Sequence, residues 1–179
     1  MNHWINQHPL QFVGIILLLF AIFWTLLINV IALASGWKLL AKRFRAQQPF
    51  SGPVWKWQYA VFRRFCGYNG CLIAGADPMG LFLNVMLSFR PGHPPLFIPW
   101  TEITLPHRPW RPDEWVDFWV DFILGSNERI PFKIRGKLAS RLQANAGTSW
   151  PLDKNETIGN SGRFGPDHKT PSSSRFVIR

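Results

Sequence analysis

Residues 10–34 read LQFVGIILLLFAIFWTLLINVIALA, and this stretch determines the fold class of the chain. Between Met1 and Trp37 the sequence contains no Asp, Glu, Lys or Arg. As a helix rising about 1.5 Å per residue, the stretch would extend roughly 37 Å, more than the ~30 Å hydrocarbon core of a bilayer. Helices buried in soluble proteins seldom lack a polar face. We therefore predict a single transmembrane helix over residues 10–35, preceded by a short external N-terminus at residues 1–9.

A cleaved signal peptide is the main alternative to an anchor, because Ala32-Leu33-Ala34 has the small-x-small form of a cleavage site. Three features oppose cleavage: the start of the chain has no Lys or Arg, the apolar run is longer than usual, and basic residues follow it at once. We expect the helix to be retained. Since cations concentrate on the cytoplasmic side, the N-terminus should be outside and the rest of the chain cytoplasmic.

Residues 36–50 are predicted to form a basic, amphipathic juxtamembrane segment. From Trp37 onward, apolar residues recur at i, i+3, i+4 and i+7, and no acidic residue occurs before Asp77. Such a cluster of cations attracts anionic headgroups by about 1 kcal/mol per residue, although it could also act only as a topology signal. The residues predicted to lie at the membrane surface are Trp37, Lys38, Lys42, Arg43 and Arg45.

The composition indicates the kind of surroundings in which the protein works, but no particular reaction. The 179 residues include 20 Lys plus Arg against 10 Asp plus Glu, which gives a formal net charge of +10. This length predicts one domain beside the helix. Two cysteines are too few for a disulfide framework or a four-thiolate metal site, and in a reducing cytoplasm Cys66 and Cys71 should be free thiols. Ten Trp and 15 Phe are typical of contact with lipid or large partner surfaces.

Residues 51–146 are predicted to form a mainly-β domain, because short apolar runs alternate there with Gly, Pro and Asn. Turns are expected at Asn69-Gly70 and at residues 77–80, and Pro99 indicates an edge strand or a bulge. In residues 81–89 the odd positions should face the core. The first strands are expected at residues 54–64, 71–76, 81–89 and 96–105.

Residues 115–124 fit two periodicities. Asp113, Asp117 and Asp121 lie four apart, as on one stripe of a helix. As a strand, the same stretch places Val116, Phe118, Val120, Phe122 and Leu124 on one face. Its β-branched and aromatic composition favours the strand.

A further strand is expected at residues 129–135, with alternating Ile and Phe facing inward and cations facing outward. A three-residue loop before it would place Asp117 opposite Arg135 and Trp119 opposite Lys133. A five-residue loop would instead place Asp121 opposite Lys133 and Trp119 opposite Arg135. Such pairs contribute about 0.2–1 kcal/mol, so they define strand register more than stability.

The C-terminal part of the chain is predicted to contain one closing helix and a tail. Residues 136–146 read GKLASRLQANA, with leucines four apart and a glycine directly after them. Residues 147–179 are rich in Gly, Pro, Ser, Thr and Asn without any apolar period. Because this composition cannot bury enough apolar surface to order itself, we predict an extended or disordered tail.

The segments CLIAGADPMGLFLNVML (71–87) and FRPGHPPLFIPWTEI (89–103) carry a resemblance to a known class of proteins. With about six short strands and one C-terminal helix behind a membrane span, the chain resembles membrane-anchored bacterial proteins with a PH-like or GRAM-like β-domain. The resemblance covers roughly residues 55–146. It implies a bent sheet or barrel capped by the helix, in the cytoplasm at a bacterial inner membrane. Known members bind lipid headgroups or proteins and are not usually enzymes.

No catalytic, cofactor or metal site is predicted. The chain lacks a glycine-rich phosphate loop with its Lys and Ser or Thr. A metal site could in principle gather Cys66, Cys71, His93 and His107, but their spacing is too loose to predict one. Asp117 and Asp121 have a simpler structural role beside the following basic strand. The positive charge is densest beside the membrane, where topology explains it, so nucleic-acid binding and a small-molecule substrate are not expected.

We therefore expect a non-enzymatic scaffold, or an accessory or assembly subunit of a larger membrane complex such as a photosynthetic or respiratory one. Its cytoplasmic β-domain should bind other membrane-protein subunits. The alternative is a module that binds anionic membrane lipids, in which case binding should weaken with salt. The expected partner-contact residues are Trp55, Trp57, Trp100, Trp110, Trp115 and Trp119.

Overall fold

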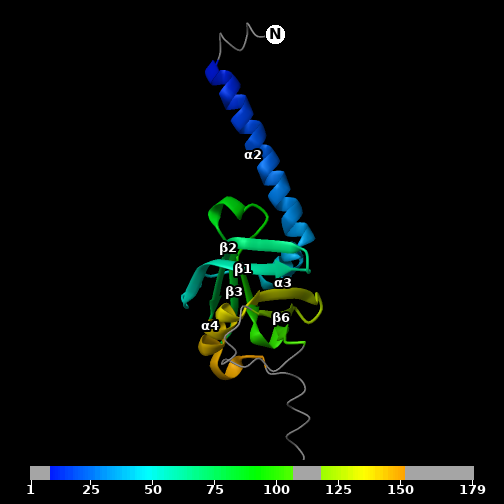
Figure 1. The fold of residues 1–179 in the computed structure, drawn as a ribbon, viewed down its shortest axis with the longest axis vertical. Helices are drawn as coiled ribbons and strands as arrows, with labels where there is room; N and C mark the ends of the chain where they lie inside the picture. Colours follow the sequence, from blue (N-terminus) through cyan, green and yellow to red (C-terminus); the bar gives the residue numbers. More distant parts are fainter. Residues whose placement is uncertain (1–8, 107–117, 152–179) are drawn as a thin grey trace, which may run out of the picture.

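The computed structural model describes residues 9–106 and 118–151, which form an apolar N-terminal helix, a seven-stranded sheet and a C-terminal helix (Figure 1). The helix α2 stands apart from the β-domain over most of its length. The elements are α2 (Pro9–Ala34), α3 (Trp37–Phe44), β1 (Val54–Phe62), β2 (Cys66–Ala76), β3 (Gly80–Val85), η1 (Leu87–Phe89), β4 (Leu96–Pro99), η2 (Trp100–Glu102), β5 (Ile103–Thr104), β6 (Trp119–Leu124), β7 (Ile130–Arg135), α4 (Gly136–Ala146) and η3 (Gly147–Ser149).

The sheet is an antiparallel, nearly closed barrel. Its strand order is β4-β3-β2-β1-β7-β6-β5, and each neighbouring pair is antiparallel. The two edge strands, β4 and β5, are separated in the chain only by the short turn η2, which brings the edges to the same side of the barrel. The predicted mainly-β domain with a closing helix is confirmed, with seven strands instead of six. Pro99 ends the edge strand β4, as expected of a residue that lacks a backbone donor.

The hairpin β1–β2 corrects the predicted turn at Asn69-Gly70. β2 is continuous from Cys66 to Ala76, and the chain reverses before it, at residues 63–65. Gly70 has a φ of +69° and lies where the register between β1 and β2 shifts. An Asn-Gly pair is typical of turns because glycine adopts positive φ, but a bulge within a strand has the same requirement.

The strand predicted over residues 81–89 is shorter in the structure. Leu81, Leu83 and Val85 are buried as the alternation predicts, but β3 ends at Val85. Leu87, expected in the core, is 78% exposed in the turn η1, which reaches toward α2 (Figure 1). Asn84 is the residue before the end of β3, and its side chain accepts a hydrogen bond from the amide of Val85. The chain therefore leaves the sheet four residues before the predicted alternation ends at Phe89.

The strands β6 and β7 confirm the interpretation of the Asp-containing stretch as a strand. Five residues separate Leu124 from Ile130, so the five-residue loop is the correct alternative. Trp119 pairs with Arg135, and Asp121 lies opposite Lys133 with a salt bridge of 3.0 Å. The inward residues of β7 are buried as predicted. Residues 115–117 of the predicted strand lie outside the described residues.

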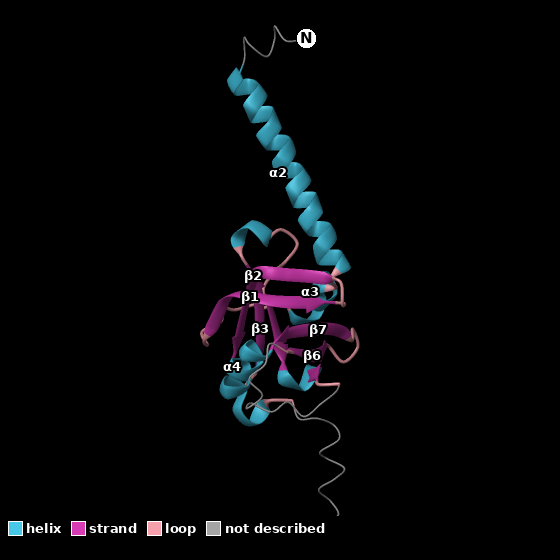
Figure 2. Ribbon diagram, viewed as in Figure 1, coloured by secondary structure: helices cyan, strands magenta, loops and turns pink. Residues whose placement is uncertain are grey.

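The closing helix α4 is confirmed, and it packs across β2, β6 and β7 (Figure 2). Ordered structure continues past the boundary predicted for the tail. Gly147–Ser149 form a 3₁₀ turn, and Trp150 is buried with its ring 5.4 Å from that of Trp100. The mostly polar composition of residues 147–179 gave no indication that Trp150 is part of the core. The rest of the predicted tail, residues 152–179, lies outside the described residues.

Candidate functional site

The junction between α2 and the barrel is a buried cluster formed by Ser35, Trp37, Tyr68 and His93, which we call the junction cluster. Trp37 is fully buried, and its indole N–H donates a 2.9 Å hydrogen bond to the carbonyl of Pro94. Its ring lies 5.8 Å from the ring of Tyr68 and 5.2 Å from that of His93. The prediction of Trp37 at the membrane surface is therefore wrong.

The correction for Trp37 extends to the apolar face of α3. Leu40 and Phe44 follow Trp37 on this face, and both are buried. The amphipathic helix is confirmed, but its apolar face packs against the barrel instead of lying free for the membrane. Periodicity defines which residues share a helix face, and the same face serves a protein core or a lipid surface equally well.

Polar groups in the junction cluster bond to one another. The hydroxyl of Tyr68 lies 2.9 Å from Ser35 Oγ and 2.7 Å from His93 Nε2. His93 Nδ1 is 3.2 Å from the carbonyl of Pro91, an acceptor only, so this nitrogen carries the proton of the neutral ring. Burial lowers the pKa of His93, against the raising effect of that carbonyl. Burial likewise raises the pKa of Tyr68, so both side chains are neutral at pH 7.

Of the four candidate metal ligands, the three that the structure describes, Cys66, Cys71 and His93, do not form a site with one another. Within residues 9–106 and 118–151, no three His, Cys, Asp or Glu side chains lie close enough to hold an ion. Cys66 and Cys71 are free cysteines, and burial raises the pKa of both thiols. His93 belongs to the junction cluster, and His107 lies outside the described residues. A raised thiol pKa is typical of an unreactive cysteine.

The cations of α3 and Arg45, which directly follows the helix, have different environments. Lys38 is half-buried, whereas Lys42 and Arg45 are exposed. Arg43 donates a 2.7 Å charge-assisted hydrogen bond to Glu102 and lies 3.9 Å from a carboxylate oxygen of Glu128. Of the predicted membrane-surface cations, Arg43 is thus already engaged by the protein.

Glu102 is held by more than its ion pair with Arg43. Its second carboxylate oxygen accepts hydrogen bonds from the amide and hydroxyl of Ser126, at 2.9 and 2.5 Å. These bonds, with a smaller contribution from Arg43, lower the pKa of Glu102. The carboxylate therefore ties η2 to the C-terminal end of α3 and to the β6–β7 loop.

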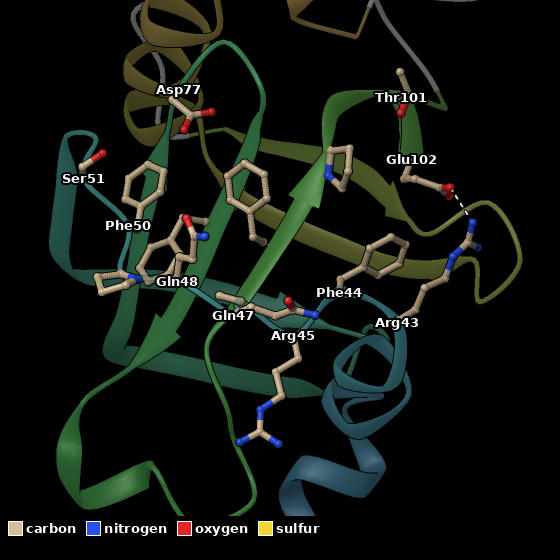
Figure 3. Close-up of a pocket in the computed structure, with 15 residues that line it drawn as sticks. Arg43, Phe44, Arg45, Gln47, Gln48, Phe50, Ser51, Asp77, Thr101 and Glu102 are labelled. Atoms are coloured by element: carbon tan, nitrogen blue, oxygen red, sulfur yellow. Dashed lines mark hydrogen bonds and ion pairs between the residues drawn. The ribbon is translucent and has the colours of Figure 1, made fainter.

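Beyond α3 the chain crosses the outside of β4 and borders a groove (Figure 3). The amide of Ala46 donates to the carbonyl of Pro95 at 2.9 Å, and Arg45 forms a single antiparallel bridge with Leu96. Phe50 then stacks on Phe82 with a centroid distance of 4.7 Å. The groove has a volume of about 630 Å³. Its lining comprises Arg43, Phe44, Arg45, Ala46, Gln47, Gln48, Pro49, Phe50, Ser51, Asp77, Phe82, Phe97, Pro99, Thr101 and Glu102.

The lining of the groove suits binding by hydrogen bonds and apolar contact. Gln47 and Gln48 are exposed in its middle, and their amides both donate and accept. Its two carboxylates are already engaged: Glu102 as described, and Asp77 by the backbone amides of Met79 and Gly80. Arg45 lies at the end near α3, and Asp77 at the opposite end (Figure 3). The groove is therefore open and polar, with aromatic rings in part of its lining.

The tryptophans predicted as partner contacts are scattered over the molecule. Trp57 and Trp119 are 63% and 40% exposed, while Trp55 is half-buried against the core. Trp100 is buried, and its indole N–H donates to the carbonyl of Asp77 at 2.8 Å, so it is not a surface contact. The remaining two predicted contacts, Trp110 and Trp115, lie outside the described residues.

Trp119 belongs to a small exposed aromatic row. The guanidinium of Arg135 lies 5.3 Å from the ring centroid of Trp119 and 5.8 Å from that of Tyr59. The three residues come from neighbouring strands, β6, β7 and β1. Cation–π contacts of this kind contribute about 0.5–1 kcal/mol at exposed sites. The row is thus a local feature of the sheet surface and is separate from the lining of the groove.

Neither the groove nor the junction cluster was predicted from the sequence. Gln47, Gln48 and Phe50 lie in a stretch with no motif, and only the two prolines around Phe50 suggest an extended crossing. In comparisons with protein families, curated proteins and solved structures, the chain matches none of them.

Proposed function

We propose that this chain is a non-enzymatic, membrane-anchored binding protein, an accessory or assembly subunit that holds another protein of a larger membrane complex. The observation that carries the proposal is the groove beside α3. It is open, its exposed amides are available for hydrogen bonds, and it begins where the chain leaves the junction with α2. A partner segment in this groove would be held within a short distance of the membrane.

The anchor itself is the helix α2, which has the length and composition of a membrane span or a signal sequence. Its C-terminal part supports retention. Ile28 and Ala32 are buried against the β-domain, and Ser35 belongs to the junction cluster. Cleavage after Ala34 would remove two of these core residues. We place the protein in a bacterial inner membrane, with the β-domain in the cytoplasm.

Kinship to membrane-anchored PH-like or GRAM-like proteins forms part of this proposal. The nearly closed antiparallel barrel and the single helix that packs on it are consistent with such a domain. Binding of proteins or lipid headgroups would then be a property of the class, with the groove as the protein-binding site in this chain.

The test is extraction of the full chain from its native membrane in mild detergent, followed by size separation. We expect a discrete assembly, larger than the 20.7 kDa chain, of fixed stoichiometry. Gln47→Trp fills the groove and should release the chain from the assembly. Arg141→Trp, at an exposed position on α4, is the matched control and should not. A wild-type chain that migrates alone would overturn the proposal, and an assembly that survives Gln47→Trp would exclude the groove as its site.

Binding of anionic lipid is the second candidate, favoured by the exposure of Lys42 and Arg45. Phosphatidylglycerol retained by the purified chain should then fall with rising salt, since salt screens exposed charges. The double substitution Lys42→Glu and Arg45→Glu should reduce retention, whereas Lys137→Glu on α4 should not. Equal retention in all three proteins would contradict this candidate.

A further inference from the structure

The loop after β3 packs along the side of α2, and its tip is the turn η1 (Leu87–Phe89), which we call the η1 tip. The indole N–H of Trp24 donates a 3.1 Å hydrogen bond to the carbonyl of Ser88. The rings of Trp24 and Phe89 are 5.8 Å apart. In Figure 1 the loop rises from the top of the β-domain beside the lower part of α2. The η1 tip is therefore placed at the level of Trp24 on the helix.

Burial along α2 defines how much of the helix is left without protein contact. Every residue from Leu10 to Phe23 is exposed. Trp24 is the first half-buried residue, and Ile28 and Ala32 are buried. Protein covers one face of the helix from Trp24 onward, and the preceding part stands alone.

The part of α2 that stands alone is too short to span a bilayer. Leu10–Phe23, 14 residues, extends about 21 Å at 1.5 Å per residue, against a hydrocarbon core of ~30 Å. The sequence before Leu10 includes Asn6, Gln7 and His8, which are polar and poorly suited to hydrocarbon. The missing length, about 9 Å or six residues, must therefore come from α2 beyond Phe23. That is the part against which the η1 tip packs.

The apolar residues of the η1 tip suit a position within the hydrocarbon core. Leu87 is 78% exposed, and Phe89 is half-buried. A single exposed leucine is ordinary on a soluble surface, but this one directly precedes Ser88 and Phe89, which contact Trp24 of α2. At the other end of the packed region, Arg63 donates a 3.4 Å hydrogen bond to the carbonyl of Ala34. Ten residues along the helix, about 15 Å, separate this cation from Trp24.

We propose that the η1 tip is inserted in the hydrocarbon of the leaflet on the side of the β-domain, with lipid acyl chains around Leu87. The inference rests on the proposed membrane span and adds a second point of insertion to it. Arg63 then lies near headgroup level. Two insertion points would hold the β-domain against the membrane in one orientation and give the groove a defined height above the lipid.

The test is spin-label accessibility in the full chain, reconstituted in vesicles of phosphatidylcholine and phosphatidylglycerol. Cys66→Ser and Cys71→Ala remove the native thiols, and single cysteines are introduced by Leu87→Cys, Leu17→Cys and Met79→Cys. Leu17 lies in the middle of the exposed part of α2, Leu10–Phe23. Met79 is 73% exposed, and its amide bonds to Asp77, which lies at the end of the groove away from α3. Oxygen partitions into lipid and a nickel chelate stays in water, so their relative effect on each label reports its depth.

We expect the label at position 87 to resemble that at 17, with high oxygen and low nickel accessibility, and the label at 79 to show the reverse. If the label at 17 is in lipid and that at 87 is as accessible to nickel as that at 79, insertion of the η1 tip is overturned and the span stands. If the label at 17 is also in water, the span is overturned, and the η1 tip with it. Because Leu87 is exposed, labelling there leaves the core intact.

Discussion

One continuous stretch of chain, residues 35–51, contributes to both the junction cluster and the groove, yet the two regions differ in burial and in side-chain chemistry. In the junction cluster, aromatic rings and hydrogen-bonded polar groups are buried together, with Trp37 and Ser35 at 0% exposure. In the groove, Gln47 and Gln48 are exposed and the volume between them and the barrel is open. The transition lies at the end of α3, where the chain leaves the core and crosses β4.

This difference separates stability from binding along the sequence. Removing a buried aromatic group leaves a cavity and unpartnered polar atoms, so substitutions in the junction cluster should unfold the domain. The exposed side chains of the groove, Gln47 and Gln48, have few contacts to lose, so substitutions of these two residues should spare the fold and alter only association. Substitutions in the two regions should therefore differ widely in their effect on the free energy of unfolding.

Trp37→Ala should have the largest effect. The side chain is fully buried among the rings of Phe62, Tyr68 and His93, and we expect a loss of about 3–5 kcal/mol, as for other buried aromatic residues. Thermal or urea unfolding of the full chain in detergent measures it. Trp57→Ala is the control, because Trp57 is 63% exposed and its loss should change stability by about 0.5 kcal/mol or less. Equal losses in the two variants would contradict the assignment of Trp37 to the core.

Gly92→Ala should come second, because this glycine allows the loop after β3 to approach α2. Its φ is +76°, and a Cβ atom there would lie 2.7 Å from Oδ1 of Asn29. We expect a loss of about 1–3 kcal/mol from backbone strain and displacement of the loop. The same unfolding measurement applies. Gly14→Ala is the control, because Gly14 lies in the exposed part of α2 and the new Cβ atom would have nothing within 4 Å. This substitution should not destabilise the protein. A loss as large as that of Gly92→Ala would show that strain and crowding at Gly92 are not the cause.

Lowering the pH should destabilise the junction cluster through His93. Burial lowers the pKa of His93 below its ordinary value of 6.5, so the unfolded chain binds a proton more readily than the folded one. The stabilisation from the neutral ring is present above pH 6.5 and is lost as the pH falls through the lower, folded pKa. Unfolding temperatures between pH 8 and pH 5 should show this decline. His93→Gln cannot titrate, and its profile should be flatter over this range; an unchanged slope would assign the decline to another group.

Glu102→Gln should have the smallest effect on stability. It removes the ion pair with Arg43 at the rim of the groove, which is partly exposed to solvent, and we expect a loss of about 0.2–1 kcal/mol. Asp121→Asn removes a comparable exposed pair with Lys133 and is the matched control for stability. Only Glu102→Gln should also weaken the assembly extracted from the membrane. If both variants weaken it equally, the effect does not come from the groove.

Several elements could be predicted from the sequence because their signals are local. The inward positions of β7 follow strict alternation, and the two leucines of α4 lie four apart, so each buried face was identified correctly. Asp121 opposite Lys133 was one of two registers left open, and only the length of the β6–β7 loop distinguished them. The turn at Asn69-Gly70 was wrong because glycine at positive φ serves a bulge as well as a reversal.

The long apolar helix, the short amphipathic helix and the β-domain after them could all be inferred from the amino-acid pattern, because hydrophobic length and period are properties of neighbouring residues. What the apolar faces contact depends on the folded arrangement. The hydrogen bonds of the junction cluster to Tyr68, His93 and Pro94 join residues 25 to 57 positions apart. The groove likewise exists because residues 43–51 cross the outside of β4. Contacts between distant segments depend on how the barrel closes, and no local pattern encodes that closure.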